Sequence, residues 1–276
     1  MAHERASKVT WVREPAVAGR FYPATPSRLE QAVRSLLEQA TGTPEPNVRA
    51  LIVPHAGYLC SGHVAACAFR RLLDHGRAGP TVYLMGPAHW LPVEGVGLST
   101  AHSFATPLGL APVAHQRVER LLQMGKPFSV ADAAHAPEHC LEVQLPFLQI
   151  VLARFQIVPM LFGIEADPAL AARALIELVN DESSLLVVSS DLSHGYTHEQ
   201  AQQMDRNLLA AVLAGDLAAV ERGEACGLSA ILCLMHMAHH FGWTPSLLGY
   251  CTSGDTCSSR ASVVGYGALL YRDLIS

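Results

Sequence analysis

Short apolar runs alternate along this chain with longer stretches in which apolar residues recur every three or four positions. Runs of four to eight apolar residues are typical of strands buried on both faces, and the longer periodic stretches are typical of amphipathic helices. The pattern predicts strands at 50–54, 81–86, 94–99, 156–163, 185–190, 246–254 and 262–271, and helices at 27–40, 61–76, 115–124, 138–152, 168–179, 198–213 and 227–241.

The order of these elements indicates the fold class. Strands and helices alternate without internal repeats or low-complexity tracts. Strands that are apolar throughout and separated by helices favour a mostly parallel sheet with helices on both faces. Because 276 residues can bury one large core, we expect a single α/β domain that spans residues 1–276.

The composition limits which classes of binding partner and which cellular compartment we expect. The chain is 50% hydrophobic and 16% charged, its formal net charge is −5, and it has no block of lysine or arginine, so we expect no nucleic-acid partner. No stretch reaches the roughly 18 uninterrupted apolar residues of a membrane span, and the N-terminal segment lacks the apolar region of a signal peptide. We therefore expect a cytoplasmic protein without a membrane partner.

The seven cysteines form no CxxC pair and no compact spacing, which argues against a disulfide framework. We expect reduced thiols, with Cys60, Cys67 and Cys233 as small core residues. Cys226 differs because it directly precedes the predicted helix at 227–241. The dipole and N–H groups of a helix N-terminus lower the pKa of a thiol, and the resulting thiolate can bind a metal ion.

Histidine-bearing turns follow three of the predicted strands. His55 follows the strand at 50–54, His89 follows the apolar run at 82–87, and His194 closes the turn after 185–190. The carboxyl ends of parallel strands form the crevice in which open α/β sheets bind ligands, and neutral imidazole is the commonest metal ligand. These turns predict a metal site or an acid/base site, although any one such histidine is as readily structural.

Two further segments carry candidate acid/base groups. Asp191 and His194 are three residues apart and could pair across a tight turn, although Asp191 is equally suited to cap a helix. His139 lies beside Glu138 in the first turn of the predicted helix at 138–152, where a cation is disfavoured. A neutral imidazole that faces a ligand is therefore plausible there. No GxSxG elbow follows any strand, which excludes the usual serine hydrolase arrangement.

A set of ordered segments resembles a known family. From about residue 13 to 271 the chain contains PHAGYLCSGHVAA, GPAHW, SFATPLG, EHCLEVQLPFL, VPMLFG, SSDLSH, a Cys-Gly pair before an apolar helix, and YCTSGDT followed by RASVVGYGALLY. Together these segments resemble the Memo family, whose bacterial members are called AmmeMemoRadiSam system protein B. Eight ordered segments are specific, whereas any one of them would be weak.

The resemblance implies a single α/β domain similar in fold to class III extradiol dioxygenases, which are non-haem iron enzymes that cleave catechol-type rings. It further implies that the metal ligands are His55, His89 and Cys226. Asp191 and His194 fall on the motif that lines the same pocket, and His139 on the motif that faces it.

The resulting hypothesis is an iron-binding dioxygenase or oxidoreductase that acts on a small molecule, with His139 or His194 as acid/base and Asp191 orienting it. Copper and zinc also suit two imidazoles and a thiolate. One alternative is a non-catalytic protein that binds a metal ion or a peptide in the cleft of the same scaffold. A zinc hydrolase is a third reading of the same ligands.

Overall fold

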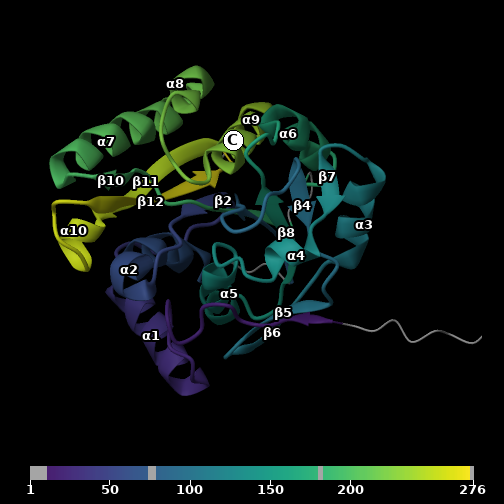
Figure 1. Ribbon diagram of the computed structural model, residues 1–276, viewed down its shortest axis with the longest axis horizontal. Coiled ribbons are helices and arrows are strands. Elements are labelled where there is room, and N and C mark those ends of the chain that lie inside the picture. The colour runs from purple at the N-terminus through teal and green to yellow at the C-terminus, as the bar shows by residue number, and fades with distance from the viewer. Residues whose placement is uncertain (1–10, 74–78, 180–182, 274–276) are drawn as a thin grey trace, which may run out of the picture.

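A nine-stranded sheet runs through the centre of the molecule (Figure 1). The computed structural model describes residues 11–73, 79–179 and 183–273. The strand order is β10-β12-β2-β9-β3-β8-β4-β7, and β11 pairs with β12. The strands are β2 (Val48–Val53), β3 (Thr81–Pro87), β4 (Val96–Leu98), β7 (Phe128–Val130), β8 (Gln156–Phe162), β9 (Ser184–Ser189), β10 (His194–Tyr196), β11 (Thr244–Thr252) and β12 (Val263–Arg272).

The sheet is parallel at its centre, and an antiparallel pairing flanks this centre on each side. β2, β9, β3 and β8 are parallel to one another, whereas β12 is antiparallel to β2 and β4 is antiparallel to β8. The prediction of an α/β domain is confirmed, but the sheet is mixed rather than mostly parallel. The difference arises because β11 and β12 pair with each other as antiparallel neighbours, which needs no long crossover helix between them.

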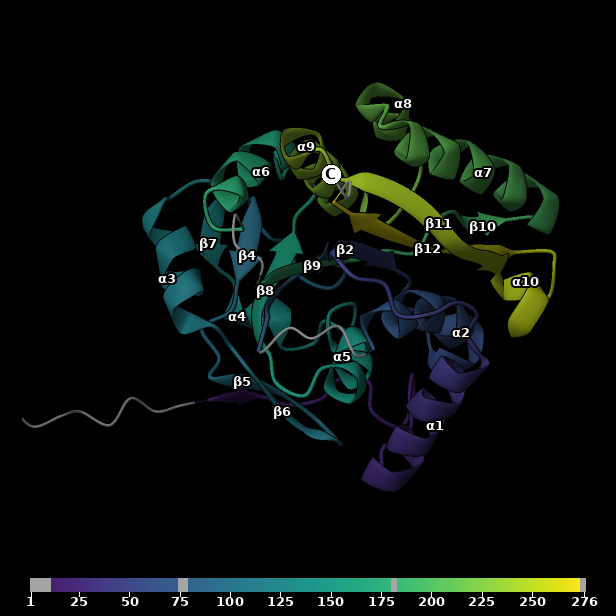
Figure 2. The ribbon, with the colours of Figure 1, turned by 180° about the vertical axis from the view of Figure 1, so that it is seen from behind.

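Helices cover both faces of this sheet (Figures 1 and 2). On one side lie α6, α7, α8 and α9, and on the other lie α1, α2 and α5. Among the described residues, no helix is both long and apolar enough to cross a membrane. The helices are α1 (Pro26–Gln39), α2 (Tyr58–Phe69), α3 (His115–Gln123), α4 (Asp132–His135), α5 (Leu145–Val151), α6 (Pro168–Ile176), α7 (His198–Ala214), α8 (Leu217–Glu221), α9 (Leu228–Phe241) and α10 (Ser253–Thr256), with 3-10 turns at Arg70–Leu72 and Glu142–Gln144.

Local sequence signals explain where α7 begins and ends. The side-chain oxygen of the N-cap residue Thr197 accepts a hydrogen bond from the backbone N–H of Gln200 at 3.4 Å. In return, the side-chain oxygen of Gln200 accepts one from the backbone N–H of Thr197 at 3.3 Å. This capping box satisfies two N–H groups that a helix start leaves unpaired. The helix ends at Gly215, whose φ of 70° is a left-handed conformation that glycine adopts without a steric penalty.

The helix predicted at 138–152 is wrong over its first half. Only Leu145–Val151 forms an α-helix, preceded by the 3-10 turn at Glu142–Gln144. Glu138 and His139 lie in the irregular segment before that turn. Pro146, which sits comfortably in a first helical turn, marks the actual start.

The core lies where the central strands meet the helices. All six residues of β9 are buried, and β2 and β3 are buried from their second or third residue onward. Each buried Val or Leu side chain contributes roughly 1.5–3 kcal/mol relative to an exposed one. The packed strands therefore hold the turns at their carboxyl ends in fixed positions.

A second, three-stranded sheet consists of β1 (Val12–Arg13), β5 (Ser103–Thr106) and β6 (Gly109–Pro112). The SFATPLG segment forms the β5 strand, the turn and the start of β6 in the β5–β6 hairpin. The buried side chain of Arg13 ties this sheet to the segment after α4: its Nε donates to the carbonyl oxygen of His135 at 3.0 Å, and its Nη1 forms an ion pair with Glu142.

The expectation that all cysteines are reduced is wrong for one pair. Cys60 in α2 and Cys257 after α10 form a disulfide, with their Cα atoms 5.2 Å apart and a sequence separation of 197. Cys60 is therefore not a core thiol. Pairing over such a separation leaves no local spacing signal, which is why the sequence does not reveal it.

Candidate metal centre

The turns after β2, β9 and β3 meet at one edge of the sheet, because these three strands are parallel neighbours. The turn after β2 carries His55, and the turn after β3 carries His89. Their ring centroids are 5.1 Å apart, with the ring planes nearly perpendicular at 80°. The structure therefore brings together the two histidines that the strand pattern singles out.

His139 completes a group of three imidazoles, which we call the histidine cluster. Its ring centroid lies 4.9 Å from that of His89 and 5.5 Å from that of His55. One potential ligand atom from each of the three residues lies within 4.8 Å of the others. The cluster could hold a metal ion, and His139 stands among its possible ligands rather than across a pocket from them.

The hydrogen-bond network assigns the tautomer of His55. The hydroxyl of Ser189, at the end of β9, donates to the carbonyl oxygen of Cys140 at 2.6 Å, so this hydroxyl accepts from the Nδ1–H of His55 at 2.9 Å. Nε2 of His55 then keeps its lone pair. Burial lowers the pKa of His55 to about 4, which leaves the ring neutral at pH 7.

Glu138 lies between the other two imidazoles. Its carboxylate accepts from the backbone N–H of His89 at 2.7 Å and from the ring Nδ1–H of His89 at 2.9 Å. It also accepts from the backbone N–H of His139 at 2.9 Å. The ring Nδ1 of His139 is 3.2 Å from Oε1 of Glu138, as an ion-pair contact.

These contacts determine the charge on Glu138. Burial raises the pKa of its carboxyl, but the contacts from His139 and the hydrogen bonds from His89 outweigh burial and hold the pKa well below the usual range. The ionised carboxylate orients His89 with Nε2 directed away from it. The role of Glu138 is hard to predict from the sequence, because acidic residues are common in the first turn of a helix.

Cys226 approaches the cluster from the segment before α9. Its Sγ lies 3.3 Å from Nε2 of His55 and accepts from the backbone N–H of Asp191 at 3.2 Å. Contrary to the expected helix-dipole effect, burial raises the pKa of the Cys226 thiol to about 12, assisted by the nearby Asp191 carboxylate. The side chain is therefore a neutral thiol that must lose its proton to act as a thiolate ligand.

Asp191 and His194 do not pair with each other as predicted. Asp191 is buried, and its Oδ1 accepts from the backbone N–H of His55 at 2.7 Å, which fixes the turn that presents that histidine. His194 lies on the edge strand β10 with an exposed side chain, and its backbone N–H is directed to Glu224 at 3.3 Å. Among the described residues, no hydrogen bond, ion pair or ring contact joins the exposed His194 side chain to His55, His89 or His139, and its place in the pocket stays a prediction.

The separations in the site suit a transition-metal ion. Two ligands on a tetrahedral ion, at bond lengths of about 2.1 and 2.3 Å, are roughly 3.6 Å apart, close to the separation between Cys226 Sγ and His55 Nε2. A second group of potential ligands combines His89, Glu138 and Cys140. In that group the Cys140 thiol donates to the carbonyl oxygen of Pro87 at 3.2 Å, and burial raises its pKa well above the usual range. The histidine cluster is therefore the better metal centre, and Cys226 contacts it through His55 without belonging to the group of three.

Comparison with known proteins gives relatives that match almost end to end. The family model described as "Memo-like protein" matches residues 13–270. A MEMO1 family protein from Archaeoglobus fulgidus is 34% identical, and the match covers 95% of this chain and 100% of that protein. A MEMO1 family protein from Sulfolobus acidocaldarius is 33% identical, with 95% of this chain and 100% of that protein covered. One from Methanopyrus kandleri is 32% identical, with 94% of this chain and 99% of that protein covered.

A solved structure shares the fold. The crystal structure of an uncharacterized protein from Escherichia coli K12 superposes with a TM-score of 0.53, covering 80% of this chain and 99% of that one. The two sequences are 16% identical. This likeness supports the fold and carries no argument about activity.

Proposed function

The chain belongs to the Memo family, and from that premise we propose that it is a metal-binding protein that holds iron(II) at the histidine cluster and acts as an oxidoreductase or dioxygenase on a small molecule. The observation that carries the proposal is the convergence of His55, His89 and His139, whose ligand atoms lie within 4.8 Å of one another. Imidazole nitrogens suit iron, copper and zinc, and Cys226 adds a softer donor beside them. Iron is favoured by the resemblance to extradiol dioxygenases.

The residues around the cluster prepare it for a metal ion. Ser189 and Glu138 each bind the Nδ1 side of a ring, on His55 and His89 respectively, and leave Nε2 free. Both rings are therefore fixed before any ion arrives, as metal-binding histidines commonly are. When bound, the ion would supply Lewis-acid and redox chemistry at coordination positions that the protein leaves open.

Two residues are available to hold or move a proton. The Cys226 thiol, whose Sγ lies 3.3 Å from His55 Nε2, releases its proton if it becomes a ligand. His139 packs against Phe21 and Trp90 in T-shaped ring pairs, and the Trp90 side chain is exposed. If His139 does not bind the ion, it is placed to act as acid/base for a molecule bound beside Trp90.

Metal analysis of single variants tests the proposal. Protein purified without added metal is expected to contain about one iron per chain, and His55→Ala, His89→Ala and His139→Ala are each expected to lose most of it. The matched control is His194→Ala, which removes an exposed histidine outside the cluster and should keep the full content. Equal iron content in wild type and in all three cluster variants would exclude this site. Copper or zinc found in place of iron would change the identity of the metal and keep the site.

Cobalt(II) substitution tests the ligand role of Cys226 separately. A thiolate bound to cobalt(II) gives an intense charge-transfer absorption in the near ultraviolet, which imidazole ligands do not. We expect this band in wild type and its loss in Cys226→Ser at full cobalt occupancy. A cobalt spectrum without the band in wild type would leave three imidazoles as the protein ligands.

A non-catalytic role on the same scaffold is the second candidate, and one observation favours it. Trp90 and Leu91, which directly follow His89, have exposed side chains of the kind that bind a peptide. This candidate predicts bound metal with no oxygen consumption on phenols or thiols. Oxygen-electrode measurements with iron-loaded protein therefore separate it from the oxidoreductase.

A further inference from the structure

A cavity opens directly beside the histidine cluster and is bordered by one of its members. It has a volume of about 580 Å³ and lies between the segment 88–94 after β3 and the segment 163–165 after β8. His89 forms one wall, and we call this cavity the His89 pocket. Its volume lies within the range of pockets that bind small molecules.

Backbone contacts fix the two segments that form the His89 pocket. The N–H of Gly163 donates to the carbonyl oxygen of Gly95 at 2.9 Å, and a Cβ on Gly163 would lie 1.8 Å from the carbonyl oxygen of Val93. Only glycine permits this approach. As a result, Glu94, which precedes Gly95, and Glu165, two residues after Gly163, line the same pocket.

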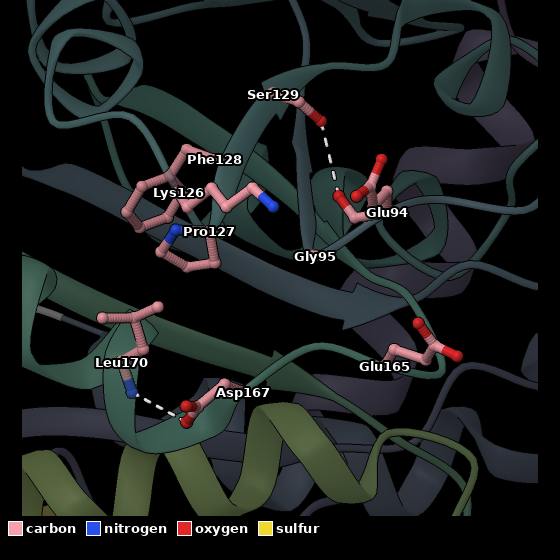
Figure 3. A pocket seen from close by; sticks show the side chains of 9 residues that line it. All are labelled: Glu94, Gly95, Lys126, Pro127, Phe128, Ser129, Glu165, Asp167 and Leu170. Atoms are coloured by element: carbon pink, nitrogen blue, oxygen red, sulfur yellow. Dashed lines mark hydrogen bonds between the residues drawn. The ribbon is translucent and has the colours of Figure 1, made fainter.

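Glu94 and Glu165 also line a second cavity, of about 330 Å³, which we call the Lys126 pocket (Figure 3). In Figure 3 the Lys126 side chain extends across this second cavity, while Asp167 is engaged by the backbone N–H of Leu170 at 2.9 Å. Lys126 does not line the His89 pocket, where, within the described part of the chain, Glu94 and Glu165 are the acidic residues of a lining that has no lysine or arginine. Among the described residues, neither glutamate carboxylate has a hydrogen-bond or ion-pair partner.

The apolar part of the same wall is an aromatic side chain. Trp90 is 60% exposed, and its ring centroid lies 6.3 Å from that of His139. Ile164, on the facing segment, is 99% exposed. An indole face binds both aromatic rings and organic cations.

We propose that the His89 pocket is the substrate site of the histidine cluster and that it selects small aromatic molecules that carry a protonated amine. The ring packs on Trp90 with its polar edge at His89, and the ammonium group reaches the unpartnered carboxylates of Glu94 and Glu165. An anionic side arm is rejected, because it would meet two negative charges and no lysine or arginine in the wall. This proposal rests on the proposed function for its metal centre and goes beyond it in naming the class of substrate.

Binding of three matched phenols tests the selectivity. Tyramine, tyrosol and 4-hydroxyphenylacetate share one ring and differ in an ammonium, hydroxyl or carboxylate end. We expect wild type to bind tyramine about tenfold more tightly than 4-hydroxyphenylacetate, with tyrosol between them, by calorimetry at low salt. The double variant Glu94→Gln/Glu165→Gln should bind all three within about twofold of one another, with its affinity for tyrosol unchanged.

The control double variant Glu38→Gln/Glu221→Gln makes the same change in net charge at exposed sites on α1 and α8, and should keep the tenfold preference. Trp90→Ala should weaken binding of all three phenols without altering their order. Equal binding of the three by wild type, or a preference that survives in Glu94→Gln/Glu165→Gln, would overturn the proposal.

The titrations are carried out with iron-loaded and with metal-depleted protein, whose metal contents are measured directly. An amine preference in both forms supports this pocket even if the native metal is not iron or no catalysis occurs. Bound iron without an amine preference would overturn the pocket's selectivity and leave the metal centre intact. The two proposals therefore fail on different measurements.

Discussion

At the scale of single residues, the site depends on the histidines that could bind a metal ion and equally on the side chains that hydrogen-bond to those histidines. Glu138 receives the ring Nδ1–H of His89 and the backbone N–H groups of both His89 and His139. Ser189 does the same for the ring of His55. Such partners fix the orientation of imidazole ligands, and their loss commonly lowers metal affinity by about 10- to 100-fold.

Removing the charge of Glu138 should therefore weaken metal binding without removing a ligand. We expect Glu138→Gln to lower the affinity for iron(II) or zinc(II) by about 10- to 100-fold, because the amide still fills the site but no longer attracts the His89 N–H as a carboxylate does. Competition with a chelator of known affinity measures this change. Glu138→Asp, which restores the charge on a shorter side chain, should recover part of the affinity. An unchanged affinity in Glu138→Gln would show that the carboxylate is only structural.

His135 gives a second prediction, on stability against pH. Burial lowers its pKa from 6.5 to about 4; Nε2 lies 3.0 Å from the carbonyl oxygen of Gly97, and Nδ1 is buried without a partner. The unfolded chain takes up this proton near pH 6.5, but the folded protein does so only near pH 4. The folded state is therefore progressively destabilised between these values as the pH falls, by about 3 kcal/mol in total for this group.

The matched variant His135→Gln isolates that contribution. Other buried histidines, such as His55, titrate in both proteins and cancel in the difference. The free energy of unfolding of wild type minus that of His135→Gln, from urea titrations, should fall by about 3 kcal/mol between pH 7.5 and pH 4. A difference that is constant with pH would mean that His135 titrates alike in the folded and unfolded chain.

At the scale of elements, the segment between α4 and α5 shows where sequence reasoning fails. Its apolar spacing predicts a helix from Glu138, yet the structure bends it into a turn and a 3-10 segment. The cause is a set of long-range contacts: Arg13 binds this segment, and Glu142 receives the backbone N–H of Ala16 at 2.7 Å and the hydroxyl of Tyr22 at 2.5 Å. Such tertiary contacts override local propensity, and no local pattern announces them.

The Arg13–Glu142 pair should be essential to this arrangement. Both side chains are almost fully buried, at 1% and 0% exposure, so removing one partner leaves an unpaired charge in the core. We expect Glu142→Gln to lower the free energy of unfolding by about 3–5 kcal/mol. Glu30→Gln removes the exposed pair with Arg34 and should cost less than about 0.5 kcal/mol in the same urea titration. Similar losses from the two variants would contradict the structural role of the buried pair.

Other elements follow from the sequence more directly. His55 and His89 could be placed at one sheet edge because each follows an apolar run and parallel strands end on the same side. The helices over 198–213 and 227–241 are confirmed within about one residue at each end as His198–Ala214 and Leu228–Phe241. The side-chain hydrogen bonds of Glu138 and the contact between Cys226 and His55 could not be deduced, since both depend on how distant turns pack.

At the scale of the whole molecule, an N-terminal and a C-terminal part of the chain are joined by a disulfide as well as by strand pairing. The last strand, β12, pairs beside β2, which brings the C-terminal part of the chain next to α2. There Cys257 is bonded to Cys60, and the Thr256 hydroxyl donates to the carbonyl oxygen of Cys60 at 3.0 Å. The turn that carries His55 and the start of α2 are thereby held to the hairpin of β11 and β12, which we call the closing hairpin.

The disulfide should stabilise the molecule mainly by restricting the unfolded chain. Its two cysteines are 197 residues apart, and in the chain-entropy picture a loop of that size is worth about 5 kcal/mol, with measured effects commonly about 2–4 kcal/mol. Reduction of wild type, Cys60→Ser and Cys257→Ser should all lower the free energy of unfolding by the same amount. The double variant should lose no more than either single one, because both changes break one bond.

Cys67→Ser provides the matched control, since it removes a free thiol from the same helix and should leave the response to reductant unchanged. Urea titrations with and without dithiothreitol measure each free energy, and thiol counting confirms the oxidation state. Additive losses from Cys60→Ser and Cys257→Ser, or a wild type that is indifferent to reductant, would mean that the two cysteines act separately. The closing hairpin would then be held to α2 by packing and the Thr256 hydrogen bond without a covalent contribution.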